Sequence, residues 1–145
     1  MRQQHMLVTG ANGFVGRALC AEAVSRGMAV RGITRASGYL PISVEKFAVD
    51  GIDGNTDWQD VLTGCEVVVH LAARVHVMAY TSANPLEAFR RVNVQGTLNL
   101  ARQAANSGVG HFVFLSSIKV NGENTAPGKA FSPFDKPAPT DHYAR

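Results

Sequence analysis

TGANGFVG, residues 9–16, is the stretch that decides the fold predicted for this chain. It places Gly10, Gly13 and Gly16 between an apolar run and a segment with helical periodicity. Glycine is needed where a chain turns tightly, where its backbone approaches a phosphate, and where a helix packs closely on a strand. The spacing G-x-x-G-x-x-G differs from the standard G-x-G-x-x-G fingerprint, and three glycines alone also occur in plain turns. Between a strand and a helix, however, they predict a dinucleotide-binding turn, because the helix N-terminus attracts an anion.

Apolar runs and helical patterns alternate on from this turn. Strands are predicted at 5–10, 29–34, 45–50, 66–73 and 111–117, and helices at 14–27, 56–64 and 85–107. Thr56 and Gln59 have capping-box spacing, and the proline-rich segment 118–140 is predicted to be an ordered loop. Strands that alternate with helices imply a parallel sheet. We therefore predict an α/β fold with a doubly wound parallel sheet, a Rossmann fold, whose ligands bind beyond the carboxyl ends of the strands.

Composition and charge exclude several classes of protein. The 145 residues fit one domain, 46% are hydrophobic and 17% charged, and no apolar run is long enough for a membrane span. The net charge is +3, but the basic residues are scattered, so a solvated surface explains them better than nucleic-acid binding. The five histidines and two cysteines have no metal-ligand spacing. We expect a cytoplasmic protein with buried reduced thiols, no metal, no membrane and no nucleic-acid partner.

The residue at the end of the second strand bears on the choice of cofactor. The fingerprint expects an acidic residue about 20 positions on, which would hold the ribose 2′-hydroxyl of NAD. No Asp or Glu occurs between Glu22 and Glu45, and the second strand ends in Arg35. An arginine there could hold the 2′-phosphate of NADP or lie against the adenine, and a solvent-facing loop arginine is the alternative. Both forms of NAD(P) therefore remain candidate cofactors.

Five motifs in order carry a resemblance to a known superfamily. They are TGANGFVG, HLAA at 70–73, RRVNVQGT at 90–97, FLSSIKVNGE at 114–123 and DHYAR at 141–145. The chain resembles the extended short-chain dehydrogenase/reductases and, within them, the NAD-dependent epimerase/dehydratase family, of the nucleotide-sugar 4-epimerase and 4-ketoreductase type found in bacterial polysaccharide synthesis. The resemblance covers essentially all of the chain. It implies that residues 1–145 are an incomplete N-terminal NAD(P)-binding domain and that the C-terminal substrate domain is absent.

The resemblance also implies roles for individual residues. Asp50 would meet the adenine, although the family's G-D-[ILV] run is displaced here by one position. His70 is predicted to be structural rather than catalytic. Asn93 falls on the buried stripe of the long helix, where it should brace loop backbone near the cofactor, and Gly96 should mark close packing. The other predicted cofactor-binding residues are Gly10, Asn12, Gly13, Phe14, Val15 and Gly16 at the pyrophosphate, Leu71, Ala72 and Ala73 at the nicotinamide ribose, and Ser116 and Tyr143.

Ser117 and Tyr143 take the positions of the family's catalytic serine and of the tyrosine in its Y-x-x-x-K motif. On their own, Ser116 and Ser117 would be polar residues that cap a strand end. A phenol with a pKa near 10 is a poor base at neutral pH, and a nearby cation lowers that pKa. Tyr143 would then take a proton from a sugar hydroxyl as hydride passes to the nicotinamide, while Ser117 binds the same oxygen. The motif's lysine would fall at position 147, so we expect the 145-residue chain alone to be inactive.

Three functions follow from the resemblance. The first is a 4-epimerase for a nucleotide sugar of the UDP-glucose or UDP-N-acetylglucosamine type, and the second is a UDP-4-keto-sugar reductase. Ile118 and Lys119 stand where dehydratases have an acidic pair, which disfavours dehydration. The third is a non-catalytic NAD(P)-binding regulator, against which the intact Ser117 and Tyr143 argue. A homodimer of the complete protein is compatible with the resemblance.

Overall fold

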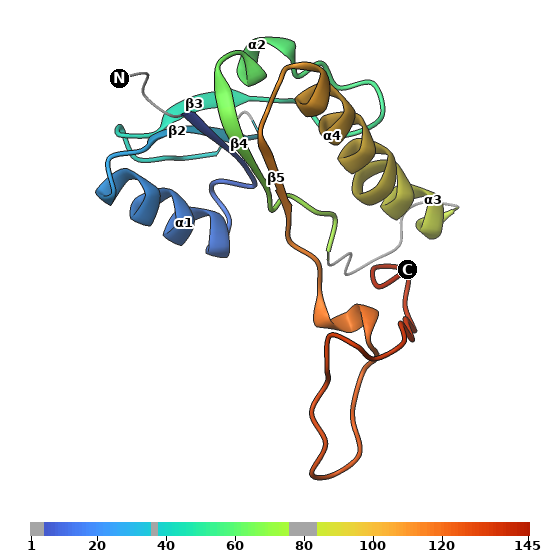
Figure 1. Cartoon of the computed structure of the whole chain (residues 1–145). Helices are drawn as coiled ribbons and strands as arrows, with labels where there is room; N and C mark the ends of the chain where they lie inside the picture. The colour runs from blue at the N-terminus through green and yellow to red at the C-terminus, as the bar shows by residue number, and fades with distance from the viewer. Residues whose placement is uncertain (1–4, 36–37, 76–83) are drawn as a thin grey trace.

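The computed structural model describes residues 5–35, 38–75 and 84–145, and its centre is one parallel sheet (Figure 1). The strands are β1 (His5–Thr9), β2 (Ala29–Thr34), β3 (Glu45–Ala48), β4 (Cys65–His70) and β5 (His111–Phe114). Their order in the sheet is β3-β2-β1-β4-β5, and every neighbouring pair is parallel. The chain thus winds outward from β1 in both directions, which confirms the predicted doubly wound fold.

Helices cover both faces of the sheet. In Figure 1, α1 (Phe14–Ser25) lies on one side, and α2 (Gln59–Leu62) and α4 (Thr97–Asn106) lie on the other. The helix α3 (Pro85–Arg90) leads into a π-helical segment, η1 (Arg91–Gly96), which continues directly into α4. Sequence periodicity predicted the whole of 85–107 as one ordinary helix. The π-helical segment was therefore missed.

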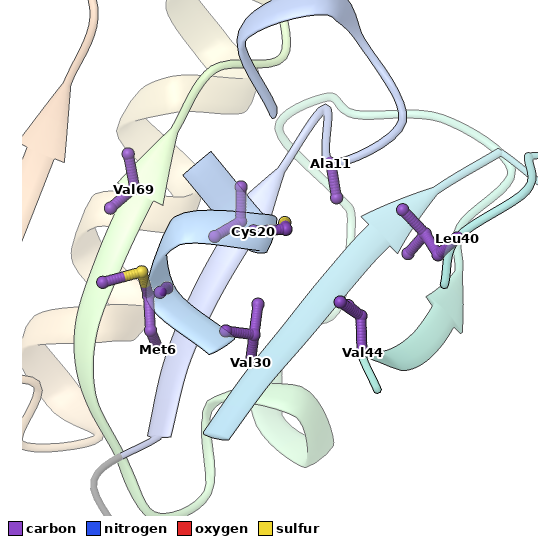
Figure 2. Packing of buried hydrophobic residues seen from close by; sticks show 9 residues of the cluster. Met6, Ala11, Cys20, Val30, Leu40, Val44 and Val69 are labelled. Atoms are coloured by element: carbon purple, nitrogen blue, oxygen red, sulfur yellow. The ribbon is translucent and has the colours of Figure 1, made fainter. Parts of the chain in front are cut away.

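The alternation of side chains along β1 builds two hydrophobic cores. Met6 and Val8 belong to one core cluster with Cys20 of α1, and Figure 2 shows Met6 beside Cys20. Leu7 points to the opposite face, where it packs with Leu100 of α4. Successive side chains of a strand point to opposite faces, so a continuous apolar run is expected where both faces are covered. This explains why the central strands contain little polar sequence.

The loop before α2 corrects one local prediction. Thr56 does not cap that helix. Its Oγ1 donates to the Gly51 carbonyl at 3.1 Å and accepts from the Asp53 amide at 3.0 Å, so it closes the preceding loop. The Gln59 amide instead donates to Asp57 Oδ1 at 3.0 Å. The predicted capping box is therefore wrong, because the threonine already has partners in its own loop.

Beyond β5 the chain leaves the sheet. A short 3-10 turn, η2 (Ile118–Val120), is followed by a long irregular segment, which Figure 1 shows extending away from the sheet before the C-terminus returns toward α3. β5 also forms one edge of the sheet, and the side chains of Val113, Phe114 and Leu115 there are each about half exposed. Among the described helices, none has the length and apolarity needed to cross a membrane.

Candidate cofactor-binding site

A cavity of about 570 Å³ opens at the carboxyl ends of the central strands. This volume lies in the range of small-molecule sites, and the position is the one at which doubly wound sheets bind ligands. Predicted residues that line it are Gly10, Asn12, Gly13, Arg35, Leu71, Ala72 and Ala73. Lining residues that the sequence analysis did not single out include Ile33, Thr34, Val49, Gly51, Ile52, Arg74, Val75 and Val92.

The glycine turn forms one wall of the cavity, and its shape requires glycine. Gly10 has a φ of +66°, and a Cβ atom there would lie 3.0 Å from the Ala72 amide nitrogen. A Cβ atom on Gly16 would lie 2.2 Å from the Gly10 carbonyl oxygen, so the first turn of α1 packs directly on the loop. Gly13 is the N-cap of α1 and has no side chain to bond the helix's first N–H groups. These groups can therefore bind an anion.

Three of the predicted pyrophosphate residues do not line the cavity with their side chains. Phe14 is 91% exposed and Val15 is 48% exposed, and neither is among the described lining residues. Gly16 is buried against the loop, so its role is to allow close packing of helix and turn. What Phe14 and Val15 can offer a ligand at this position is their backbone N–H groups.

A buried histidine holds the end of β4 against β1. His70 Nδ1 lies 2.7 Å from Thr9 Oγ1, and His70 Nε2 lies 2.9 Å from Thr97 Oγ1. Thr9 Oγ1 also accepts from the amides of Leu71 and Ala72, each at 3.1 Å. The threonine proton is therefore directed to Nδ1, and the ring must be neutral with its proton on Nε2. These contacts agree with the prediction that His70 is structural.

This arrangement predicts a pH dependence of stability. Burial lowers the pKa of His70 from 6.5 to about 4. Between those values the unfolded chain binds a proton that the folded protein does not. The free energy of unfolding should therefore fall by about 3 kcal/mol as the pH drops from 6.5 to 4, and His70 should contribute no further change below that range. Urea unfolding at several pH values measures this.

The matched control is the exposed His111. His70→Gln should remove most of this pH-dependent loss, whereas His111→Gln should retain it. If the two variants show the same pH dependence as the parent, His70 is not the group that links protonation to unfolding.

Arg35 and Asp50 have different positions relative to the cavity. Arg35 lines it at the end of β2 and is exposed. Asp50 is exposed and does not line the cavity, whereas its neighbours Val49 and Gly51 do. The Asp50 carboxylate therefore lies outside the cavity lining, and its contact with the adenine stays a prediction. The loop turns so that Val49 and Gly51, on either side of Asp50, face the cavity.

Removing the Arg35 side chain should change the choice between cofactors. Arg35→Ala is expected to weaken NADP binding by about 10- to 100-fold, the loss that follows when a charged hydrogen-bond partner is removed. NAD binding should change little, because NAD has no 2′-phosphate. Calorimetric titration with both cofactors measures this, with Arg17→Ala on exposed α1 surface as the control. An equal loss for both cofactors would assign Arg35 to another part of the ligand.

Asn93 supports the cavity from the π-helical segment. Its Oδ1 accepts from the Arg74 amide at 2.8 Å, and its Nδ2 donates to the Arg74 carbonyl at 3.0 Å. The backbone bracing expected of Asn93 is thereby confirmed. Gly96 packs against the loop on the other side, since a Cβ atom there would lie 2.6 Å from Ile52 Cγ2. The close packing predicted for Gly96 is confirmed as well.

Arg74 is a charged lining residue that sequence reasoning missed. Its guanidinium carbon lies 5.6 Å from the centre of the Phe89 ring, which adds a cation–π contact to the backbone clamp from Asn93. The sequence signal that could have identified Arg74 is its position directly after Ala73, the last of the three residues predicted at the nicotinamide ribose.

The predicted catalytic residues lie outside the cavity lining, in the segment after β5. Ser116 is exposed. Ser117 is half-buried, and its Oγ accepts from the Lys119 amide at 3.3 Å at the start of η2. Tyr143 is half-buried in a turn where the Ala144 amide donates to Asp141 Oδ1 at 2.7 Å. Within the described residues, no group of three or more His, Cys, Asp or Glu side chains is arranged to hold a metal ion.

Comparison with known proteins defines the class to which this fold and cavity belong. The model of the NAD dependent epimerase/dehydratase family matches residues 6–145, and the chain belongs to that family. A UDP-glucose 4-epimerase from Vibrio cholerae is 43% identical over an alignment of 148 positions, gaps included, which covers 95% of this chain and 42% of the relative. A 3-beta-hydroxysteroid dehydrogenase from Mycolicibacterium neoaurum is 33% identical over 84% of this chain and 36% of its own length.

A solved structure of a related enzyme is also similar to this chain. The crystal structure of the Thermus thermophilus UDP-glucose 4-epimerase in complex with NAD matches with a TM-score of 0.81 and 27% sequence identity. The match covers 97% of this chain and 46% of that one. The chain thus spans less than half the length of the relatives it matches.

Proposed function

We propose that this chain is the NAD(P)-binding part of a nucleotide-sugar 4-epimerase that acts through a 4-keto intermediate. The substrate class is UDP-glucose or UDP-N-acetylglucosamine. The observation that carries the proposal is the glycine turn at the cavity, where a Cβ atom on Gly10 would meet the Ala72 backbone. The 43% identity to a UDP-glucose 4-epimerase supports the choice of reaction and substrate.

The residues present fit a nicotinamide cofactor. The uncapped N-terminus of α1 suits a pyrophosphate, and the edge Leu71–Ala73 offers backbone beside the small side chains of Ala72 and Ala73, where a ribose could lie. A bound cofactor would supply a nicotinamide ring that accepts and returns hydride. Arg35 would face the adenosine end, where its guanidinium could bind the 2′-phosphate of NADP.

Ser117 and Tyr143 would act on the sugar hydroxyl. The Ser117 hydroxyl would bind the oxygen at C4, and the Tyr143 phenol would hold or release its proton as the C4–H bond breaks or forms. An epimerase returns the hydride to the other face of the same carbon. Cofactor is then neither consumed nor produced over the complete cycle, which separates this reaction from a reduction.

The experiment uses the full-length protein with UDP-glucose and UDP-N-acetylglucosamine in turn. We expect the C4 epimer to form with a catalytic amount of NAD and with no lasting change in absorbance at the wavelength of the reduced cofactor. Stoichiometric consumption of reduced cofactor with a UDP-4-keto sugar would identify the reductase instead. Cofactor binding without turnover of any nucleotide sugar would favour a regulatory module.

A second candidate rests on the hydroxysteroid dehydrogenase relative. Its 33% identity makes oxidation of a secondary alcohol on a sterol an alternative use of the same serine and tyrosine. A 3-hydroxysteroid assayed with NAD tests this directly. Steady formation of reduced cofactor with the steroid, and none with the sugar nucleotides, would replace the first proposal.

A further inference from the structure

One lysine joins the two turns that carry the proposed catalytic residues. Lys119 Nζ lies 2.5 Å from Asp141 Oδ2, which makes an ion pair between positions far apart in the sequence. The same ammonium lies 3.1 Å from Glu123 Oε1. Since Lys119 belongs to η2 and Asp141 to the C-terminal turn, this ion pair ties one turn to the other.

Each end of the ion pair is connected to a proposed catalytic residue. The Lys119 amide donates to Ser117 Oγ at 3.3 Å, so the serine caps the turn that the lysine occupies. On the other side, Asp141 Oδ1 accepts from the Ala144 amide at 2.7 Å and begins the turn that contains Tyr143. One carboxylate therefore does two things: Oδ2 binds the lysine, and Oδ1 orders the turn around the tyrosine.

Further contacts strengthen this link. Thr140 Oγ1 lies 3.0 Å from Glu123 Oε1, and the Ala138 amide donates to the Val120 carbonyl at 2.9 Å. A single exposed ion pair contributes little to stability, but a network that closes a long loop fixes geometry. The intervening segment contains no other described helix or strand to hold its ends together. The network around Lys119 has this role.

The charges in this network suit a clamp better than a catalyst. The hydrogen bond with Asp141 is the main cause that raises the pKa of Lys119, and the same bond lowers the pKa of Asp141. Both groups are therefore charged at neutral pH. Because the ammonium faces two carboxylates, it is already neutralised and has no excess positive charge with which to activate a phenol.

We propose that Lys119 is a positioning residue, whose ion pair with Asp141 holds the turn of Tyr143 against the turn of Ser117. This inference rests on the proposed function, in which both residues act on one hydroxyl. A displacement of about 1 Å in such an arrangement can lower a rate about 100-fold. The clamp therefore gives the chain a way to set the geometry of two groups that lie outside the strands and long helices of the described residues.

The variants that test this are Lys119→Met, which removes the ammonium, and Asp141→Asn, which removes the charge but keeps an oxygen for the Ala144 amide. In the full-length protein each should lower kcat by about 10- to 100-fold, while KM and the cofactor Kd change by less than about twofold. The double variant should be no worse than either single one, because both remove the same interaction. Lys119→Arg should restore most of the rate.

The control and a second readout separate this clamp from the proposed function. Lys129→Met removes an exposed lysine of the same loop and should leave kcat unchanged. Amide hydrogen exchange of peptides covering 137–145 should be faster in Lys119→Met and Asp141→Asn, and as slow as in the parent in Lys119→Arg and Lys129→Met. If the parent turns over no nucleotide sugar, the proposed function fails, and the exchange pattern still decides whether Lys119 holds the turns. Unchanged exchange, or additive losses in the double variant, would overturn the inference.

Discussion

Replacing Tyr143 by phenylalanine is expected to lower kcat of the full-length protein by about 10²–10⁴-fold, the usual contribution of a general acid or base. The substitution removes one hydroxyl and keeps the ring, which is half-buried in the turn that Asp141 begins. Folding and cofactor binding should therefore be preserved, because the cavity at the strand ends does not include this residue. Steady-state kinetics with the accepted sugar nucleotide, together with calorimetric titration of the cofactor, measure both halves of the expectation.

Tyr39 provides the matched control. It is 81% exposed and does not line the cavity, so Tyr39→Phe should leave kcat at the parent value. If Tyr143→Phe is as active as Tyr39→Phe, Tyr143 is not the proton-transfer group, and the proposed mechanism loses its base.

Replacing Gly13 by valine is expected to weaken cofactor binding by at least about 100-fold, or about 2.7 kcal/mol. A Cβ atom at Gly13 would already lie 3.1 Å from the Gly10 carbonyl oxygen, which is a tight contact. The two methyl groups of valine would then occupy the space in front of the first N–H groups of α1, where the pyrophosphate is expected. Calorimetric titration with NAD and NADP measures the loss, and a thermal melt checks that the variant is folded.

Gly110 is a suitable control for this substitution. It lies outside the cavity lining, and a Cβ atom there would approach its nearest neighbour, the Glu66 carbonyl oxygen, only to 3.6 Å. Gly110→Val should therefore bind the cofactor as the parent does. Equal affinity in a folded Gly13→Val variant would mean that the glycine turn does not cradle the ligand.

The fold could be predicted from the sequence because the features that define it are local. Continuous apolar runs mark strands buried on both faces, and in β4 the neighbours Val68 and Val69 do belong to the two different cores. The glycine turn could also be predicted, since positive φ and close packing have few other solutions. The predicted strands at 45–50, 66–73 and 111–117 extend beyond the C-terminal ends of the observed β3, β4 and β5. The reason is that apolar residues continue from these strands into the loops that line or approach the cavity.

Other parts of the structure depend on contacts between distant segments and were not visible in one sequence. The helical period along 85–107 gives no sign of a π-helical segment, which arises where Asn93 bonds the Arg74 backbone and Gly96 packs on Ile52. Asp50 was expected at the adenine from the resemblance to the family's G-D-[ILV] run, but the path of the loop decides which side chains line the cavity, and these are Val49 and Gly51. The Lys119–Asp141 pair is equally invisible, because a lysine in a loop usually faces solvent.

The two edges of the sheet differ in a way that bears on handling this chain in solution. The edge strand β3 begins with Glu45 and Lys46, and charges on an edge discourage pairing with another strand. At the opposite edge, β5 reads HFVF, and the apolar side chains of Val113, Phe114 and Leu115 are half exposed. We therefore expect the β5 edge to take part in any self-association of the 145-residue chain.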